Sequence, residues 1–311
     1  MAQMVAILDK LLSNTSSAYV PKGCKAEEIL PPIMSKEFTG KLAKYGTNHL
    51  RIETTVVGGR GKFRQVETQN RSQSSYAIEG HGLEGLVTRE DYANVLLPYD
   101  AERDETLGVS TILLLEKEKG LADSLTSTST MTQNVTLSGV DQYSDYDNSD
   151  PIDDFSTARA AVRAGCGALA DTAIMDWAVY NKLRFHPQML DAMGFKIARP
   201  GGLNEEEMIT ALGVERVIIP NAMYESAAEG QTSSLASVWG KHIVFAVLPK
   251  VAQTYQVSLG YRVQLAGEQP RKVTKWAVNN PDGANSILVT DYYDMFLSNV
   301  LAGYLIKDAI A

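Results

Sequence analysis

The segment from residue 54 to residue 85, TTVVGGRGKFRQVETQNRSQSSYAIEGHGLEG, limits what this chain can fold into more than any other part of the sequence. It reads as extended chain, yet it has few large apolar side chains, many Gly and Ser residues, and clustered Arg and Lys. Such a segment cannot bury itself as an ordinary half-buried strand does. It also contains a literal G-x-G-x-x-G at Gly80, Gly82 and Gly85. Two interpretations follow: a nucleotide-binding loop, or an arm that docks on another surface.

A long β-hairpin is the simplest reading of residues 50–78. The β-favouring pieces LRIETTVV, KFRQVE and SYAI flank the turn Gly58-Gly59-Arg60-Gly61. Glycine supplies the positive φ that tight hairpin turns require. We therefore predict a hairpin whose turn lies at this glycine cluster.

The nucleotide interpretation needs a β-α-β context, with a strand before the glycines and a helix opening at the third. The following residues, LVTREDYANVLLP, are broken by Thr88 and Pro98, so this context is missing. The glycines then favour a flexible hinge. No G-x-x-x-x-G-K-[ST] occurs either, because Phe63 follows Gly61-Lys62.

Composition limits the class of protein. The chain has 311 residues, 44% hydrophobic and 21% charged, which suits a folded protein of one large or two ordinary domains. No apolar run approaches the roughly 18 residues that cross a bilayer. The start, MAQMVAILDKLL, lacks a basic region and contains Asp9, so we expect no secretory signal. Cys24 and Cys166 are isolated, which argues against a disulfide framework or a zinc site and favours the reducing cytosol.

The rest of the chain divides by composition. Residues 13–50 are irregular and punctuated by Pro and Gly, as expected of an arm laid over something else. A helix is predicted over 99–127, followed by a polar, Asp-rich loop. A second helix begins at Asp150-Pro151, and its apolar stripe predicts a spine helix of residues 151–184. After RPGGL, Asn204 to Glu207 form a capping box, and an α/β lobe follows to residue 300.

Catalytic and metal motifs are weak. The four histidines belong to no H-E-x-x-H, and no G-x-S-x-G is present. An enzyme would have to use loose candidates in the C-terminal lobe, namely Asp291, His242 and Glu215. The acidic loop around Asp145 departs from the calcium-loop pattern, and a solvated connection is the better reading. We predict no catalytic residues, no metal and no cofactor.

The hairpin carries a local charge excess. Arg60, Lys62, Arg64 and Arg71 stand against Glu67 alone between residues 54 and 75, although the chain's net charge is −8. These residues serve the solubility of an exposed hairpin, or they dock on an acidic patch of another copy. A nucleic-acid site is the least favoured option, because aromatic residues are nearly absent there and the chain is acidic.

The order of elements resembles the major capsid protein family of tailed bacteriophages, whose fold encapsulin shells share. The resemblance spans nearly the whole chain and includes MDWAVYNKLRFHPQML, LGVERVIIPNAMYESA with SVWGKHIVFAVLP, and the tail TDYYDMFLSNVLAGYLIKDAI. It implies an α+β fold with five parts: an N-terminal arm (1–50), an extended β-hairpin loop (51–90), a peripheral domain with the spine helix (91–200), an axial domain (201–300) and a C-terminal return (301–311).

The resemblance also implies a function. The chain would be a non-enzymatic major capsid protein that self-assembles, as pentamers and hexamers, into an icosahedral shell around a double-stranded DNA phage genome. Its partners would be further copies, a scaffolding protein, a portal, and packaged DNA near the inner face, with no membrane. Its location would be the virion, after assembly in the host cytoplasm. The alternatives are an encapsulin-like compartment and, less favoured, a soluble α/β enzyme.

Under this interpretation the hairpin lies across a neighbouring subunit. The suspected inter-subunit residues are Gly59, Arg60, Gly61, Lys62, Phe63, Arg64 and Arg71. Arm and hairpin cannot offset their own ordering entropy, so we expect both to fold only on assembly.

Overall fold

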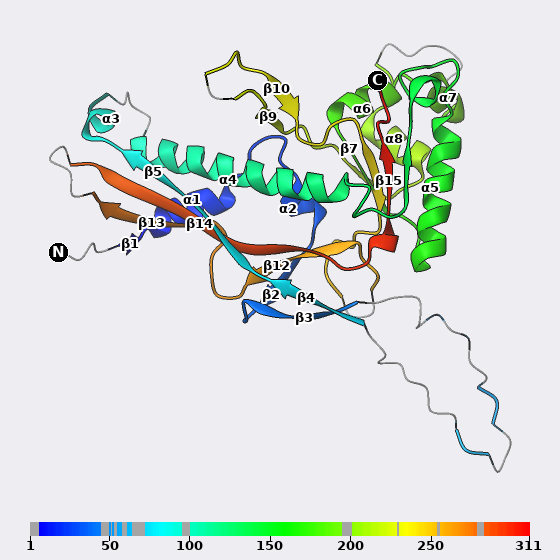
Figure 1. The fold of residues 1–311 in the computed structure, drawn as a ribbon, viewed down its shortest axis with the longest axis horizontal. Coiled ribbons are helices and arrows are strands. Elements are labelled where there is room, and N and C mark those ends of the chain that lie inside the picture. The colour runs from blue at the N-terminus through cyan, green and yellow to red at the C-terminus, as the bar shows by residue number, and fades with distance from the viewer. Residues whose placement is uncertain are drawn as a thin grey trace.

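The computed structural model describes residues 6–44, 50, 52, 55–57, 61–63, 72–94, 100–194, 201–228, 230–253, 256–278 and 283–311. These residues form two lobes that share one long helix, α4 (Ala101–Leu125), as Figure 1 shows. We call them the six-strand lobe and the five-strand lobe after the sheets that the described residues form.

The six-strand lobe is built around β14 (Asn285–Leu297), a 13-residue strand. The sheet runs β1-β13-β14-β12-β2, with β5 also paired to β14. Helices α1 and α4 pack on it, because α1 contacts β13 and α4 contacts both β5 and β14. The other elements of this lobe are β1 (Ile7–Leu8), α1 (Lys10–Ala18), α2 (Ala26–Ile29), β2 (Pro32–Ser35), β5 (Glu79–Val87), α3 (Arg89–Asn94), β12 (Gly260–Leu265) and β13 (Lys272–Ala277).

The five-strand lobe has the strand order β6-β15-β11-β7-β8. Its central strands β7 and β11 are buried throughout, and Phe245 of β11 packs against Phe155 of a covering helix. The strands are β6 (Asn134–Thr136), β7 (Thr172–Met175), β8 (Arg216–Ile218), β11 (Ile243–Ala246) and β15 (Gly303–Lys307). The helices are α5 (Pro151–Cys166), α6 (Trp177–Leu183), α7 (Pro187–Ala192) and α8 (Glu205–Leu212), with short 3-10 turns at Gly139–Asp141 and Val300–Ala302. A separate ribbon pairs β9 (Met223–Glu225) with β10 (Leu235–Ser237).

Helix α4 connects the two lobes. It confirms the helix predicted over 99–127, and its 25 residues span about 38 Å at 1.5 Å per residue. Val109 and Leu113, in its first half, belong to a cluster with residues of β5, β13 and β14. Leu121 and Leu125, in its second half, belong to the large core of the five-strand lobe. The long spine of the fold is therefore α4.

The spine helix predicted over 151–184 is wrong. Helix α5 ends at Cys166, where Gly167 takes the left-handed φ of 78°, and strand β7 and helix α6 follow as separate elements. The glycine cap stops the helix, since a left-handed residue ends the helical hydrogen-bond pattern. The apolar stripe appeared to continue because β7 is buried on both faces and lacks the alternation of an exposed strand.

The predicted boundary near residue 200 also differs from the structure. Strands β12 to β14 lie in the sheet of the six-strand lobe together with β5, although they follow the five-strand elements in sequence. The C-terminal strand β15 pairs with β6 and β11 inside the five-strand lobe. Each lobe is thus discontinuous in sequence, and a composition shift at one point of the chain does not separate them.

Candidate assembly surfaces

The stem of the hairpin is an antiparallel ladder between β3 (Thr39–Lys44) and β4 (Ser72–Ala77), in which Thr39 faces Ala77 and Lys44 faces Ser72. Residue 58 lies midway along the chain between these partners, at the predicted glycine turn. Residue 58 itself, like Gly59, Arg60, Arg64 and Arg71, lies outside the described residues. The ladder pairs 39–44 with 72–77, so its first strand precedes the predicted hairpin, and 79–87 form β5. The described residues 52, 55–57 and 61–63 of the predicted strands are not in strand conformation.

Tyr76 anchors this stem to the six-strand lobe. Its hydroxyl lies 2.6 Å from Ser35 Oγ, and its ring packs over Gly40, where a Cβ atom would lie 2.5 Å from the Tyr76 oxygen. Tyr76 and Ile78 belong to a buried cluster with Val263 and Phe296. The root of the hairpin is therefore fixed by its own subunit.

Beyond the stem, the described residues of the hairpin are exposed. Residues 55–57 and 61–63 lie apart from both lobes in Figure 1. Gly61 and Lys62 are exposed, and Phe63 exposes 86% of its surface, Val56 86% and Ile52 97%. Large apolar side chains at such exposure are expected to be covered by another surface.

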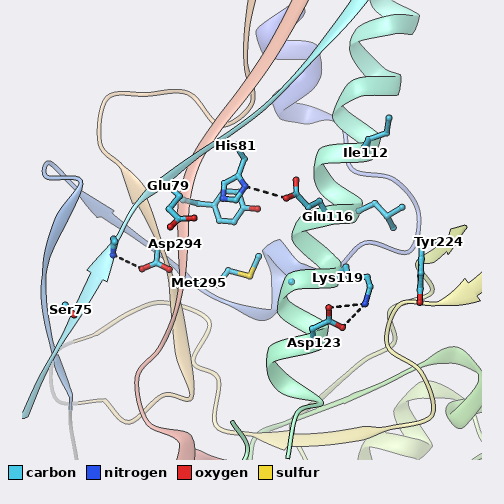
Figure 2. Close-up of a pocket in the computed structure, with 14 residues that line it drawn as sticks. Ser75, Glu79, His81, Ile112, Glu116, Lys119, Asp123, Tyr224, Asp294 and Met295 are labelled. Carbon is cyan, nitrogen blue, oxygen red and sulfur yellow. Dashed lines mark hydrogen bonds and ion pairs between the residues drawn. The ribbon is translucent and has the colours of Figure 1, made fainter. Parts of the chain in front are cut away.

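A groove of about 860 Å³ lies between α4 and the strands β4, β5 and β14 (Figure 2). Its apolar lining comes from Ile112 and Leu115 of α4 and from Tyr293 and Met295 of β14. Four carboxylates line it: Glu79, Glu116, Asp123 and Asp294. Lys119 is the amino group among the lining residues, and Asp123 already holds its Nζ at 2.8 Å. The groove is therefore lined by both apolar side chains and carboxylates, and its net charge is negative.

Side-chain contacts shape this groove. His81 stacks on Tyr293 with ring centroids 4.3 Å apart, and its Nδ1 lies 3.8 Å from Glu116 Oε1. Asp294 accepts a hydrogen bond from the Ala77 amide at 3.0 Å. Burial raises the pKa of Asp294, although this hydrogen bond opposes the shift. The groove thus presents fixed acceptors next to β4, the strand at the root of the hairpin.

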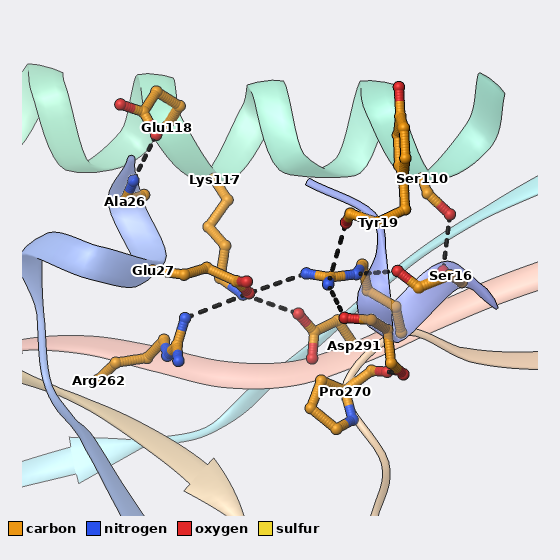
Figure 3. Close-up of polar contacts among 12 residues, drawn as sticks. Ser16, Tyr19, Ala26, Glu27, Ser110, Lys117, Glu118, Arg262, Pro270 and Asp291 are labelled. Carbon is orange, nitrogen blue, oxygen red and sulfur yellow. Dashed lines mark hydrogen bonds and ion pairs between the residues drawn. The ribbon is translucent and has the colours of Figure 1, made fainter. Parts of the chain in front are cut away.

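The N-terminal arm is held by a buried ion cluster (Figure 3). The carboxylate of Glu27, in α2, lies 3.0 Å from Lys117 Nζ, 2.9 Å from Arg271 Nη1 and 3.2 Å from Arg262 Nη1. Lys117 also binds Asp291 of β14 at 2.8 Å. The cluster therefore joins the arm, α4 and the six-strand sheet.

The arm contributes to the apolar core as well. Ile29 and Leu30 are buried in the large core cluster, and Leu12 of α1 is buried in the cluster beside β13. Arg271 donates to the backbone oxygens of Ser16 and Ser17. The expectation that residues 13–50 lack a core of their own and order only on assembly is therefore wrong for residues 13–44, because their apolar and charged side chains find partners within the chain.

No family model matches the chain. It is 22% identical over 308 residues to the major capsid protein of Burkholderia phage BcepMu, covering 97% of this chain and 96% of that protein. It is 28% identical over 255 residues to the major capsid protein of Pseudomonas phage JBD67, covering 79% of each. The chain is a homologue of phage major capsid proteins.

Solved structures show the same capsid fold. A phage-related protein from Bordetella bronchiseptica RB50 is similar with a TM-score of 0.76 and 22% identity, over 98% of each chain. The capsid of cyanophage P-SCSP1u is similar with a TM-score of 0.59 and 9% identity, over 93% of this chain and 89% of that one. The α+β tailed-phage capsid fold that the sequence resembled is thus confirmed.

The glycine motif has a structural role in this capsid fold. Gly80, Gly82 and Gly85 lie in β5, paired with β14, and form neither a nucleotide loop nor a hinge. A Cβ at Gly85 would lie 2.2 Å from Glu105 Oε1 of α4, and one at Gly80 would lie 2.9 Å from the Tyr292 ring. The glycines allow α4 and a tyrosine to approach the strand closely.

The loose enzymatic candidates are dispersed in this capsid-protein homologue. Asp291 binds Lys117 inside the six-strand lobe. His242, in the five-strand lobe, accepts the Asp308 amide at its Nδ1 (3.0 Å), and Glu215 is exposed next to β8. Within the described ranges, no group of three or more His, Cys, Asp or Glu is arranged to hold a metal ion. No helix in the described part of the chain is long and apolar enough to span a membrane.

Sequence reasoning missed the acidic groove and the ion cluster of this homologue. The lining carboxylates come from β5, α4 and β14, and the cluster joins residues that are up to 264 positions apart. The available signal was weak: Lys117 and Glu118 are charged residues on the apolar side of the predicted helix, and both are buried.

Proposed function

We propose that this protein is the major capsid subunit of a phage, and that it assembles with further copies of itself into a closed icosahedral shell. The observation that carries the proposal is that the exposed residues 61–63 offer a cation and a large apolar side chain, while the groove along α4 is lined by carboxylates and apolar side chains. One copy offers both surfaces, so a second copy satisfies both. The homologous relation to phage major capsid proteins supports this function.

The hairpin of one copy would place Phe63 against the apolar lining residues Ile112 and Met295, with Lys62 facing the lining carboxylates. Burying an exposed Phe contributes about 1.5–3 kcal/mol, whereas each exposed ion pair contributes only about 0–1 kcal/mol. The apolar anchor therefore supplies most of the affinity, and the charges fix the register and favour association over wrong contacts. Gly59, Arg60, Gly61, Arg64 and Arg71 would complete the docking segment.

This contact would be head-to-tail, because hairpin and groove are different surfaces. Head-to-tail contacts form closed rings when the rotation between neighbours closes, which suits pentamers and hexamers of a shell. The protein would act without catalysis or cofactor. Its place would be the virion, after assembly in the host cytoplasm.

A scaffolding protein and a portal are the further partners we propose, with packaged double-stranded DNA near the inner face. The net charge of −8 suits a subunit that lies near DNA without gripping it, since tight phosphate binding requires many Lys and Arg contacts. An encapsulin-like compartment is the alternative. It would enclose a cargo protein, and it is less supported because both relatives described above are phage major capsid proteins.

Assembly of the full chain is the first test. Size-exclusion chromatography with negative-stain electron microscopy is expected to show closed shells, tubes or rings. A protease-resistant monomer at every concentration would contradict the proposal, because the hairpin would then have found burial within its own chain.

Docking is tested by charge reversal and rescue. Lys62→Glu is expected to leave the thermal unfolding of the subunit unchanged and to impair assembly, and Glu116→Lys is expected to restore assembly when combined with it. Lys250→Glu, at an exposed position outside the groove and the hairpin, is the matched control. Normal assembly of both Lys62→Glu and Phe63→Ser would rule out the hairpin as the docking element.

A further inference from the structure

Glu118 occupies the point of α4 at which the helix passes from one lobe to the other. Leu113 packs in the six-strand lobe, Leu115 packs against the edge of the large core, and Leu121 lies inside that core. The side chain of Glu118 is fully buried. A buried carboxylate is stable only when hydrogen-bond donors satisfy it.

Both oxygens of Glu118 are engaged. Oε1 accepts the indole Nε1–H of Trp239 at 2.6 Å. Oε2 accepts the backbone amides of Lys25 at 2.8 Å and Ala26 at 2.6 Å, as Figure 3 shows for Ala26. Three segments that are distant in sequence, namely the arm, α4 and the Trp239 loop, therefore meet on one carboxylate.

Trp239 belongs to the five-strand lobe. It follows β10, precedes β11 and lies in the large core. The next residue, Gly240, has a φ of +63°, which fixes the turn that directs the indole toward α4. The Glu118–Trp239 bond thus ties the middle of α4 to a rigid part of the five-strand lobe.

We propose that Glu118 is a positioning residue that sets the angle between the two lobes, and that the subunit varies this angle by releasing the Trp239 indole. The inference rests on the proposed function, since a subunit that occupies pentamers and hexamers needs more than one lobe orientation. A single charged hydrogen bond suits a device with two discrete states, because the contact is either made or broken. The arm bonds to Oε2 keep the carboxylate partly satisfied after the indole leaves.

The conservative variant Trp239→Phe separates this role from simple packing. It keeps an aromatic ring in the core and removes the N–H that reaches Glu118. Glu118→Gln keeps the size of the side chain but replaces one oxygen acceptor with an NH2 group. That group cannot accept a hydrogen bond from the N–H donors that face it. Asp104→Asn is the matched control, because Asp104 is an exposed carboxylate on the same helix and does not line the groove.

The experiment measures the distance between spin labels in the two lobes of the full-length chain. Labels at Arg103→Cys on α4 and Ala164→Cys on α5 use exposed positions, and Cys24 and Cys166 are buried. Labelled chain is diluted into unlabelled chain, so that distances within one subunit dominate whether or not shells form. We expect a broader or shifted distance distribution for Trp239→Phe and Glu118→Gln, and no change for Asp104→Asn.

Two further readouts complete the test. Backbone amide exchange at Ala26 is expected to rise about tenfold or more in Glu118→Gln, given the usual strength of a hydrogen bond to a charged group. Where shells form, Trp239→Phe is expected to widen their diameter distribution, whereas a purely structural role would only reduce their number.

An unchanged spin-label distance distribution in Trp239→Phe overturns the inference. This test remains valid even where the Glu118→Gln variant does not fold. If Trp239→Phe broadens the spin-label distance distribution but leaves the shell diameters unchanged, the lobe motion exists but assembly does not use it. That result would overturn the second half of the inference. Failure of the wild-type chain to assemble overturns the proposed function alone, because the distance measurement does not depend on assembly.

Discussion

Glu27 is the residue whose replacement tests the buried ion cluster most directly. Burial by itself would raise its pKa, but Lys117, Arg271 and Arg262 outweigh this effect and lower the pKa from 4.5 to about 2. One pKa unit corresponds to about 1.4 kcal/mol, so the ionised side chain contributes on the order of 3 kcal/mol to folding. This contribution ties the arm to the rest of the six-strand lobe.

We expect Glu27→Gln to lower the free energy of unfolding by about 3–5 kcal/mol at neutral pH, because it leaves Asp291 facing three buried cations. The matched control is Glu28→Gln. Glu28 is the next residue, its side chain is half exposed, and it binds Lys25 at 2.8 Å. Such a surface pair contributes about 0–1 kcal/mol. Urea unfolding of both variants measures the difference.

The pH dependence has a definite sign. The folded-state pKa of Glu27 is depressed, so its contribution is present above the unfolded value of 4.5 and is lost as the pH falls toward about 2. The stability gap between wild type and Glu27→Gln should therefore shrink over this range. Equal stabilities of the Glu27→Gln and Glu28→Gln variants, or a gap that does not change with pH, would refute the reasoning.

Two further predictions concern single positions. Gly23 has a φ of +113°, and a Cβ there would lie 2.6 Å from the Asn221 backbone oxygen, so Gly23→Ala should lower the free energy of unfolding by about 1–3 kcal/mol. Gly108 lies in α4 with nothing within 4 Å of a new Cβ, so Gly108→Ala should instead raise the free energy of unfolding by up to about 1 kcal/mol. Midpoints of thermal unfolding that shift in the same direction in Gly23→Ala and Gly108→Ala would contradict this reasoning. The buried Tyr143 hydroxyl donates to Asp154 at 2.9 Å, and Tyr143→Phe should lower the free energy of unfolding by about 1–3 kcal/mol in urea titrations.

Local chemistry made several elements predictable from the sequence. Asp150 caps α5 with Pro151 in the first turn, Asn204 and Glu207 form the capping box of α8, and Gly213 ends that helix with a φ of 64°. Each of these signals depends on residues that are neighbours in the chain. The structure confirms them because no distant contact competes with them.

The spine helix could not be placed in this way. The sequence shows apolar residues at helical spacing on both sides of Gly167, and a buried strand gives no alternation that would distinguish it from a helix. Only the pairing of β7 with β11 and β8 decides the conformation. These partners lie tens of residues away, so the information is tertiary.

The burial of the arm also depends on contacts between charged residues that are distant in sequence, so it could not be predicted from the sequence. Residues 13–44 look too irregular and polar to hold themselves, because the partners of Glu27 are Lys117, Arg262 and Arg271. In a sequence each of these four residues reads as surface charge. In the fold all three cations lie within 3.2 Å of the Glu27 carboxylate, so the arm is held by partners in its own subunit.

A pre-ordered arm changes what assembly has to supply. The cost of ordering residues 13–44 is met by contacts within the subunit, so the free energy of assembly does not have to offset it. The groove and the hairpin also share β4, since Ser75 and Ala77 line the groove while the same strand forms the stem. In the proposed docking, the direction of the hairpin is therefore coupled to the position of the groove that would receive the next hairpin. A substitution in β4 that moves the stem would shift both surfaces at once, and so change the rotation between neighbouring subunits on which ring closure depends.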